Sequence, residues 1–372
     1  MFASYSSVEL RSQPWRKDGL FRGYLDNVKV NLIAQCEELP HRNMDEQYEI
    51  KIDSPDAPLE GTIISHSVWG ILRGLESFSH LLLPSGSAYV LNSTQIMDFP
   101  RFSFRGLMLD TARHFLPVSK LKENLDLMAM NKLNVFHWHL VDDQSFPYES
   151  AAFPNLSKLG SYSSNHVYSA EDVADVVEYA RLRGIRVLPS STLQVTPNPG
   201  DLGNRGWLTK CYTNSTPDGT VRPDRPPTND ANYKFCRASS PRSRTASRTI
   251  MFIWAATRES NPAITQFMAE HNITGNYSKL EEIYITKLLD IVANLPTKNG
   301  YLVWQEVFDN GVEVAKDTVV HVWKSSPLWK QEIDELLYAG RDVLGTAAVG
   351  IGDTEGGHKK ENQSIIDQTF AL

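Results

Sequence analysis

One stretch, residues 101–150, constrains the fold of this chain more than any other. Residues 106–110 form a short apolar run that ends in a carboxylate, which is typical of a buried parallel strand. Apolar residues at helical spacing follow over residues 121–128, and residues 135–140 are rich in side chains that favour strands. The order strand, helix, strand therefore predicts a parallel α/β unit.

Polar side chains collect where these two strands end. Asp110 and Arg113 follow the first strand, and Asp142 and Asp143 follow the second. In a parallel α/β barrel, the carboxyl ends of the strands form the face that carries the active site. Charged side chains gathered there predict a site for a polar ligand.

The chain before residue 100 has the pattern of a small α+β domain. Residues 1–27 show no clear periodicity, and we expect them to be partly disordered. Two alternating strands, an amphipathic helix and another strand are then expected at residues 28–32, 48–52, 67–83 and 88–91. The domain is expected to end near Phe99 and Pro100, which places the boundary between residues 1–99 and residues 100–372.

After residue 102, strands and helices alternate as they do in a barrel. Ser169 and Asp172 form a capping box that begins a helix, and Gly184 ends it. Strands are further expected at residues 185–188, 301–304, 319–323 and 342–344, and helices at residues 279–295 and 330–337. The alternation predicts the α/β class and a (β/α)8 TIM-type barrel. Because it stops short, we expect the barrel to be incomplete.

Three long motifs carry a resemblance to a known family. They read Arg-Gly-Leu-Met-Leu-Asp-Thr-Ala-Arg-His from residue 105, Asn-Lys-Leu-Asn-Val-Phe-His-Trp-His-Leu-Val-Asp-Asp-Gln-Ser-Phe-Pro from residue 131, and Ala-Arg-Leu-Arg-Gly-Ile-Arg-Val-Leu-Pro from residue 180. They resemble the β-N-acetylhexosaminidases, family 20 of the glycoside hydrolases, and the likeness runs with interruptions from about residue 28 to residue 344. It implies that residues 1–99 match the non-catalytic domain that precedes the barrel in this family. It also implies the removal of terminal N-acetylglucosamine or N-acetylgalactosamine by retaining hydrolysis.

The resemblance also implies a catalytic motif that this chain lacks. In this family the substrate's own acetamido oxygen attacks the anomeric carbon, an exception to the usual pair of protein carboxylates. The enzyme supplies an Asp that orients the acetamido group and a Glu that acts as general acid and base, both within a His-Leu-Gly-Gly-Asp-Glu motif. Thr257 and Arg258 occupy the positions of that Asp-Glu pair. We therefore predict that no catalytic residue is retained.

The replacement has the form of a shifted reading frame. With suitable codons, residues 250–258 read one base earlier give Asp-Tyr-Val-His-Leu-Gly-Gly-Asp-Glu. Residues 190–197 read in the same direction give Glu-Phe-Asp-Thr-Pro-Gly-His-Thr, the family's third-strand motif. We infer out-of-frame windows near residues 190–203 and 236–258. The alternative to a shifted frame is a divergent basic loop. The alternative to an enzymatic function is an inactive pseudogene product or a non-catalytic sugar-binding relic.

Three side chains that match the family's sugar pocket survive. Arg113 matches the arginine that grips the sugar's hydroxyl groups, a task suited to a fixed fork of donors. Asp142 matches a carboxylate at the pocket rim, and Trp304 matches a wall of the acetamido cage. The alternatives are a structural ion pair of Arg113 with Asp110 or Asp142, a barrel-bottom or loop salt bridge for Asp142, and core packing for Trp304.

No metal and no cofactor are expected. His137 and His139 share one face of a strand, but no third ligand at a suitable spacing follows, so we interpret them as core histidines or as supports of the site. Cys211 resembles a family cysteine that pairs with one just after the Asp-Glu motif, and that partner is absent here. Cys36 and Cys236 complete an odd set, which leaves at least one cysteine outside any internal disulfide.

Charge and targeting signals narrow the partners. The net charge of −7 argues against nucleic acid, and no apolar run is long enough to cross a bilayer. The first residues have no apolar core like that of a signal peptide, yet six glycosylation sequons recur, at Asn92, Asn155, Asn214, Asn272, Asn276 and Asn362. The set favours a lumenal ancestor whose leader is missing. The resemblance implies N-acetylhexosamine-terminated glycans as partners, a dimeric parent, and a lysosomal or secreted location.

Overall fold

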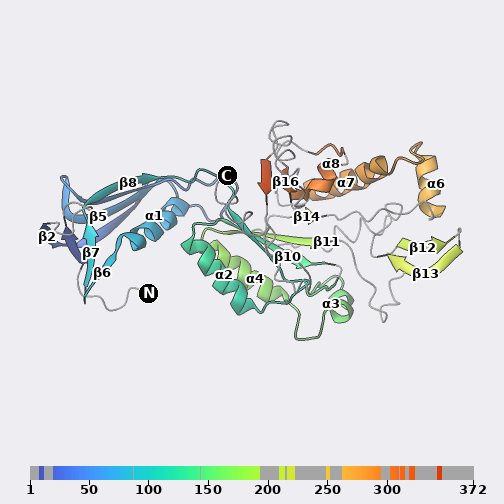
Figure 1. Cartoon of the computed structure of the whole chain (residues 1–372), viewed down its shortest axis with the longest axis horizontal. Helices are drawn as coiled ribbons and strands as arrows, with labels where there is room; N and C mark the ends of the chain where they lie inside the picture. Colours follow the sequence, from blue (N-terminus) through green and yellow to red (C-terminus); the bar gives the residue numbers. More distant parts are fainter. Residues whose placement is uncertain are drawn as a thin grey trace, which may run out of the picture. The chain divides into compact units, whose positions relative to one another are not determined.

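A computed structural model describes twelve segments of the chain (Figure 1): residues 8–11, 20–86, 88–142, 144–192, 209–213, 216–222, 249–251, 262–294, 302–309, 311–314, 318–322 and 342–345. Contacts divide the chain into two compact units. Unit 1 holds Met1–Leu107, Val118–Phe136 and Asp175–Val187, and unit 2 holds Met108–Pro117, His137–Ala174 and Leu188–Leu372. The boundary predicted between residues 99 and 100 stays a prediction. No helix in the described segments has both the length and the apolar character needed to cross a membrane.

A four-stranded sheet with one covering helix begins unit 1. The strand order is β3-β5-β4-β8, with β3 at Asn27–Leu32, β4 at Tyr48–Ser54, β5 at Ala57–Ser65 and β8 at Thr94–Asp98. The predicted strands over residues 28–32 and 48–52 are confirmed, whereas β5 and β8 were not predicted. Alternate residues of β4 point into a core with helix α1 (Val68–Leu81), and the buried members of that core are Leu10, Tyr48, Ile50, Ile52, Ile63, Ile71 and Leu91.

Helix α1 lies close to the sheet because two of its residues are glycines. A Cβ atom at Gly70 would stand 2.3 Å from the carbonyl oxygen of Gln47, and one at Gly74 would stand 2.7 Å from Ile63 Cγ2. Ser67 caps the N-terminus of the helix, because its hydroxyl accepts hydrogen bonds from the backbone N–H groups of Trp69 and Gly70. The predicted helix over residues 67–83 is confirmed, with slightly shorter bounds.

A second sheet includes two strands within residues 1–27, where no element was predicted. It has the order β2-β1-β7-β6, with β1 at Val8–Arg11, β2 at Phe21–Tyr24, β6 at Leu83–Ser85 and β7 at Ala88–Asn92. Strand β1 pairs in parallel with β7 and antiparallel with β2, with an irregularity after Leu10. Strands of four residues are too short to show a period, so the pairing with distant β7 decides their conformation.

The alternating elements after residue 102 form barrel-type strands and helices. One sheet has the order β14-β11-β10-β9, with β9 at Gly106–Asp110, β10 at Val135–Val141, β11 at Arg186–Thr192 and β14 at Thr249–Met251. Another has the order β15-β16-β17, with parallel strands at Leu302–Trp304, Val319–Val322 and Asp342–Gly345. The helices are α2 (Val118–Met130), α3 (Asn155–Gly160), α4 (Ala170–Arg181), α6 (Pro262–Glu270), α7 (Tyr277–Ala293) and α8 (Gln305–Asp309), and β12 (Thr209–Thr213) and β13 (Thr216–Arg222) form a hairpin.

Most of the expected barrel elements are present. The strands expected at residues 106–110, 135–140, 185–188, 301–304, 319–323 and 342–344 and the helix at 279–295 are found, and the helix expected at 330–337 lies outside the described residues. Ser169 and Asp172 form the predicted capping box, since each backbone N–H bonds the other's side chain. Gly184 adopts a left-handed φ of 65° just after the helix, as expected of a stop.

Strand β14 differs from what the frameshift inference led us to expect. It lies inside the predicted window 236–258, for which we predicted no strand, yet it pairs in parallel with β11 through Ser190, Ser191 and Thr192. Backbone hydrogen bonds do not depend on the side chains, and Thr249 and Ile250 are β-branched. A short strand therefore forms within the predicted window.

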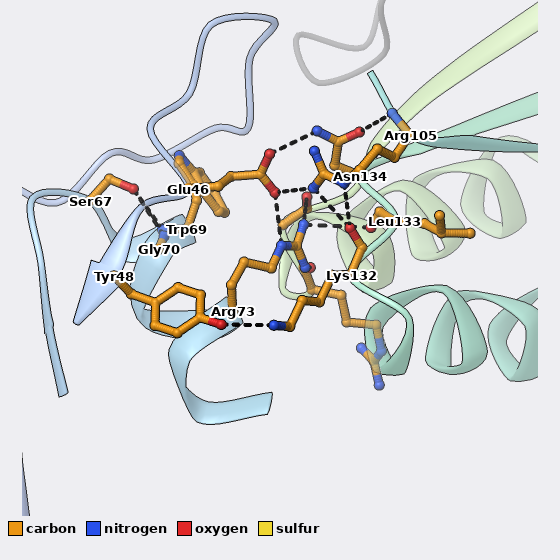
Figure 2. A network of polar contacts seen from close by, with 12 residues as sticks. Glu46, Tyr48, Ser67, Trp69, Gly70, Arg73, Arg105, Lys132, Leu133 and Asn134 are labelled. Carbon is orange, nitrogen blue, oxygen red and sulfur yellow. Dashed lines mark hydrogen bonds and ion pairs between the residues drawn. The ribbon is translucent and has the colours of Figure 1, made fainter. Parts of the chain in front are cut away.

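A buried polar network in unit 1 was not predicted (Figure 2). Glu46 Oε1 accepts hydrogen bonds from Arg73 Nε at 2.8 Å and from Arg105 Nη2 at 2.7 Å, and Glu46 Oε2 accepts one from Asn134 Nδ2 at 3.0 Å. The side chains of Glu46 and Arg73 are 2% and 4% exposed. Arg73 also donates to the carbonyl groups of Arg183 and Gly184. The Glu46 carboxylate thus joins α1 to the segments before β9 and β10, and Arg73 extends the network to the loop before β11.

Candidate functional site

The two predicted side chains Arg113 and Asp142 meet where β9 and β10 end. Arg113 Nη1 lies 2.5 Å from Asp110 Oδ2, and Arg113 Nη2 lies 2.5 Å from Asp142 Oδ2. Arg113 Nε donates to Gln144 Oε1 at 3.2 Å. Asp142 is 2% exposed at its side chain and Arg113 is 41% exposed. Both ion pairs of the alternative role of Arg113 are therefore present, and they hold a guanidinium that solvent can still reach.

A tight turn after β9 positions Arg113. Asp110 Oδ1 accepts the backbone N–H groups of Ala112 at 3.1 Å and of Arg113 at 3.0 Å, while Oδ2 of the same carboxylate binds the guanidinium. An Asp that bonds the backbone two and three residues ahead reverses the chain at the end of a strand. The sequence Asp-Thr-Ala-Arg thus sets both the turn and the side chain that it presents.

Two histidines of β10 continue the contacts inward from Asp142. His139 Nε2 lies 2.6 Å from Asp142 Oδ2, and His139 Nδ1 lies 2.9 Å from Ser190 Oγ. His137 Nε2 lies 2.9 Å from the same Ser190 oxygen. The prediction that His137 and His139 share one face is confirmed, because both reach one hydroxyl group of β11. Both are buried, in agreement with their interpretation as core or supporting histidines.

Trp304 lies at the inner end of this chain of contacts. Its ring centroid is 6.1 Å from that of His137 and 4.4 Å from that of His321, and the residue is 7% exposed. The sequence did not identify His321 as a site residue, because a single His within the apolar strand β16 carries no signal of its own. The structure thus brings Arg113, Asp142 and Trp304 into one contiguous set, whereas Thr257 and Arg258 lie outside the described residues.

Burial keeps two of these histidines neutral. Desolvation lowers the pKa of His321 from 6.5 to about 3, with a smaller contribution from His139. Desolvation also holds the pKa of His137 well below 6.5, and the nearby His321 and His139 add to the effect. A charged imidazole in this cluster would lose its hydration and meet other histidines, so the folded state excludes the proton.

Stability is therefore expected to fall as the pH falls below about 6.5. Because the folded pKa of His321 is about 3, the unfolded chain binds more protons than the folded chain between about pH 6.5 and pH 3, and stability rises with pH across that window. At pH 4.5 the loss from His321 amounts to about 2–3 kcal/mol relative to pH 7. Urea unfolding at both pH values measures it.

The variant His321→Gln isolates this contribution from the carboxylates that titrate in the same range. It is expected to lose less stability than the wild type between pH 7 and pH 4.5. An equal loss in both proteins would contradict the assignment.

Three side chains of the site are of types that could bind a metal ion. Asp110, His139 and Asp142 each offer one ligand atom, and these atoms lie within 4.8 Å of one another. The Arg113 guanidinium already lies between the two carboxylates. A cation that competes for them would have to displace that charge. The expectation of no metal remains a prediction.

Cysteine geometry is described only for Cys36. It is an exposed, free thiol whose Sγ lies 3.7 Å from the carbonyl oxygen of Glu37. The side chains of Cys211 and Cys236 lie outside the described residues, so the absence of a partner for Cys211 stays a prediction.

Comparisons with known proteins match most of the chain to two family models. A family model described as "Glycosyl hydrolase family 20, catalytic domain" matches residues 102–193 and 253–364, and one described as "beta-acetyl hexosaminidase like" matches residues 7–81. The matches begin before residue 28 and end after residue 344, so they extend beyond the limits that we expected. The break over residues 194–252 contains most of both predicted out-of-frame windows.

Curated relatives are similar over most of this chain. Beta-hexosaminidase subunit alpha of Bos taurus is 45% identical over 311 residues, which cover 80% of this chain and 56% of the relative. Beta-hexosaminidase subunit beta of Homo sapiens is 40% identical over 327 residues, which cover 85% of this chain and 57% of the relative. The chain thus spans little more than half the length of these two proteins.

Solved structures show the same fold. The chitobiase of Flavobacterium johnsoniae is 27% identical with a TM-score of 0.68, and the match covers 86% of this chain and 48% of that one. The beta-N-acetylhexosaminidase of Bacteroides fragilis is 18% identical with a TM-score of 0.66, covering 85% and 62%, and supports the fold alone. With a catalytic-domain match over more than half its length, this chain belongs to glycosyl hydrolase family 20, the family of the β-hexosaminidases.

Proposed function

We propose that this chain binds the terminal N-acetylhexosamine of glycans at the ends of its barrel strands. The observation that carries the proposal is the Arg113 guanidinium, which two carboxylates fix at 2.5 Å while its side chain stays 41% exposed. A guanidinium held in one orientation presents N–H donors with a defined geometry, as recognition of sugar hydroxyl groups requires. Family membership gives the ligand class.

Asp142 and Trp304 complete the proposed pocket. Asp142 acts as a rim carboxylate that also fixes Arg113 and His139, and Trp304 forms the wall against the acetamido methyl group. The support for Asp142 is its position between Arg113 and His139, at 2.5 Å and 2.6 Å. The support for Trp304 is its membership of the same contiguous set of contacts through His137.

The reaction of this class is substrate-assisted, retaining hydrolysis, and we propose that this chain as written has no measurable hydrolytic activity. Thr257 has no carboxylate with which to orient the acetamido group. Arg258 stays protonated at any ordinary pH, so it cannot act as general acid and base. The chain then acts as a sugar-binding relic, and the alternative is an inactive pseudogene product. An in-frame Asp-Glu pair in the transcript would instead indicate a competent natural enzyme.

The wider organisation is proposed from the family. A non-catalytic α+β domain over residues 1–99 precedes an incomplete catalytic barrel over residues 100–372, which is supported by separate family matches that end at residue 81 and begin at residue 102. Family membership also supports a lysosomal or secreted location, a dimeric parent, and glycans rather than nucleic acid as partners.

Replacing Arg113 with alanine is expected to weaken the binding of N-acetylglucosamine by about 10- to 100-fold. The reason is the loss of charge-assisted hydrogen bonds, which contribute roughly 1.5–3 kcal/mol each. Isothermal titration calorimetry measures the dissociation constant. Glucose, which lacks the acetamido group, is the control ligand.

Two further variants sharpen this test. Arg113→Lys keeps the charge between Asp110 and Asp142 but removes the fork, so it is expected to bind weakly as well. Arg181→Ala removes an arginine that pairs with Glu178 on α4 and is expected to bind as the wild type does. Unchanged binding by Arg113→Ala would contradict the proposed function.

A further inference from the structure

The segment between α3 and α4 holds the backbone of the loop that carries Arg113. Tyr162 Oη donates a hydrogen bond to the carbonyl oxygen of Arg113 at 2.9 Å. Tyr168 Oη donates to the carbonyl oxygen of Leu116 at 2.5 Å and accepts the backbone N–H of the same residue at 3.3 Å. Two tyrosines from one segment thus bond the loop at two points.

Ring contacts reinforce the outer part of this loop. Phe115 stacks on Tyr168 with ring centroids 4.6 Å apart, and His166 meets Phe115 edge-on at 5.1 Å. Ser163 Oγ lies 2.7 Å from His166 Nδ1, which fixes that ring in turn. The loop around Arg113 is therefore held by side chains some 50 residues later in the chain.

The two tyrosines differ in what else they do. Tyr168 is fully buried and packs edge-on against Trp138 at 5.1 Å, so it belongs to the core. Tyr162 is 53% exposed. A hydrogen bond at such an exposed position contributes little to stability, because water can replace it. Its consequence is local, since it fixes the residue whose guanidinium lies between Asp110 and Asp142.

We propose that Tyr162 is a positioning residue for sugar binding, which acts by holding Arg113 in its binding orientation. The inference rests on the proposed function of Arg113. A guanidinium on a loop that moves must be ordered again when the sugar arrives, and that ordering lowers the affinity. The Tyr162 hydroxyl lowers this cost through its hydrogen bond to the Arg113 backbone.

The test is a double-mutant cycle in the full chain, with N-acetylglucosamine as the probe. Tyr162→Phe removes only the hydroxyl and is expected to raise the dissociation constant about three- to tenfold. In the Arg113→Ala background the same change is expected to have almost no effect, because the two residues act as one unit. Tyr179→Phe, which removes a phenol that bonds Asp126, is the matched control and is expected to bind as the wild type does.

A second measurement does not depend on the ligand. The Arg113 Nε–H resonance is expected to broaden and exchange faster in Tyr162→Phe, at an unchanged melting temperature. Wild-type binding by Tyr162→Phe, or an equal loss in the Arg113→Ala background, would overturn the inference and leave the proposed function standing. Wild-type binding by Arg113→Ala would overturn both.

Discussion

The purified chain is expected to release no chromogenic leaving group from a β-N-acetylglucosaminide above a no-protein control. Hydrolysis in this family needs one carboxylate to orient the acetamido group and one to transfer protons, and Thr257 and Arg258 supply neither. Removal of a general acid alone costs about 10²- to 10⁴-fold in rate. Loss of the orienting Asp as well lowers the rate further.

Restoration of the motif is the matching gain-of-function experiment. Thr257→Asp and Arg258→Glu are introduced within a replacement of residues 250–258 by Asp-Tyr-Val-His-Leu-Gly-Gly-Asp-Glu. The control protein carries the same replacement with Thr257→Asn and Arg258→Gln. The carboxylate protein is expected to exceed the amide protein by about 10²-fold or more. Turnover by the unaltered chain, or equal rates for the two replacements, would contradict the assignment.

Sequence reasoning predicted the elements whose signals are local. Strands β9 and β10 and helix α4 have an apolar period, a carboxylate at a strand end or a capping box within a few residues. Strand β5 was missed because its buried face carries Gly61 and Ser65 beside Ile63, while the apolar Ile64 lies on the other face. The burial of the strand alternates, but its sequence does not alternate between apolar and polar residues.

The site was predictable only in part, for a similar reason. Arg113 and Asp142 follow strands that the sequence defines, and parallel strands bring their carboxyl ends together. The choice between a sugar-binding arginine and a structural ion pair could not be made from spacing, and the structure shows both ion pairs with the guanidinium still exposed. Ser190 and His321 join His137 from strands far along the chain, so only tertiary structure could place them there.

Replacing Glu46 with alanine is expected to destabilise the chain by about 3–5 kcal/mol, since breaking a buried ion pair leaves an uncompensated buried charge. Here two arginines lose their carboxylate, Arg73 at 4% side-chain exposure and Arg105 at 18%. Burial already lowers the pKa of Arg73, and Glu46 is the largest opposing influence. Without it, Arg73 keeps its desolvation cost and loses the interaction that offsets it.

Urea unfolding at pH 7 measures the change, and Trp69 on α1, 2% exposed, provides a fluorescence signal next to the network. Glu123→Ala is the matched control, because its pair with Lys120 is 57% and 59% exposed and such pairs contribute roughly 0–1 kcal/mol. Glu46→Gln keeps the shape and one acceptor oxygen, so its loss is expected to fall between the two. A loss for Glu46→Ala no larger than that for Glu123→Ala would mean that the two arginines find other partners, and the network would not join these segments.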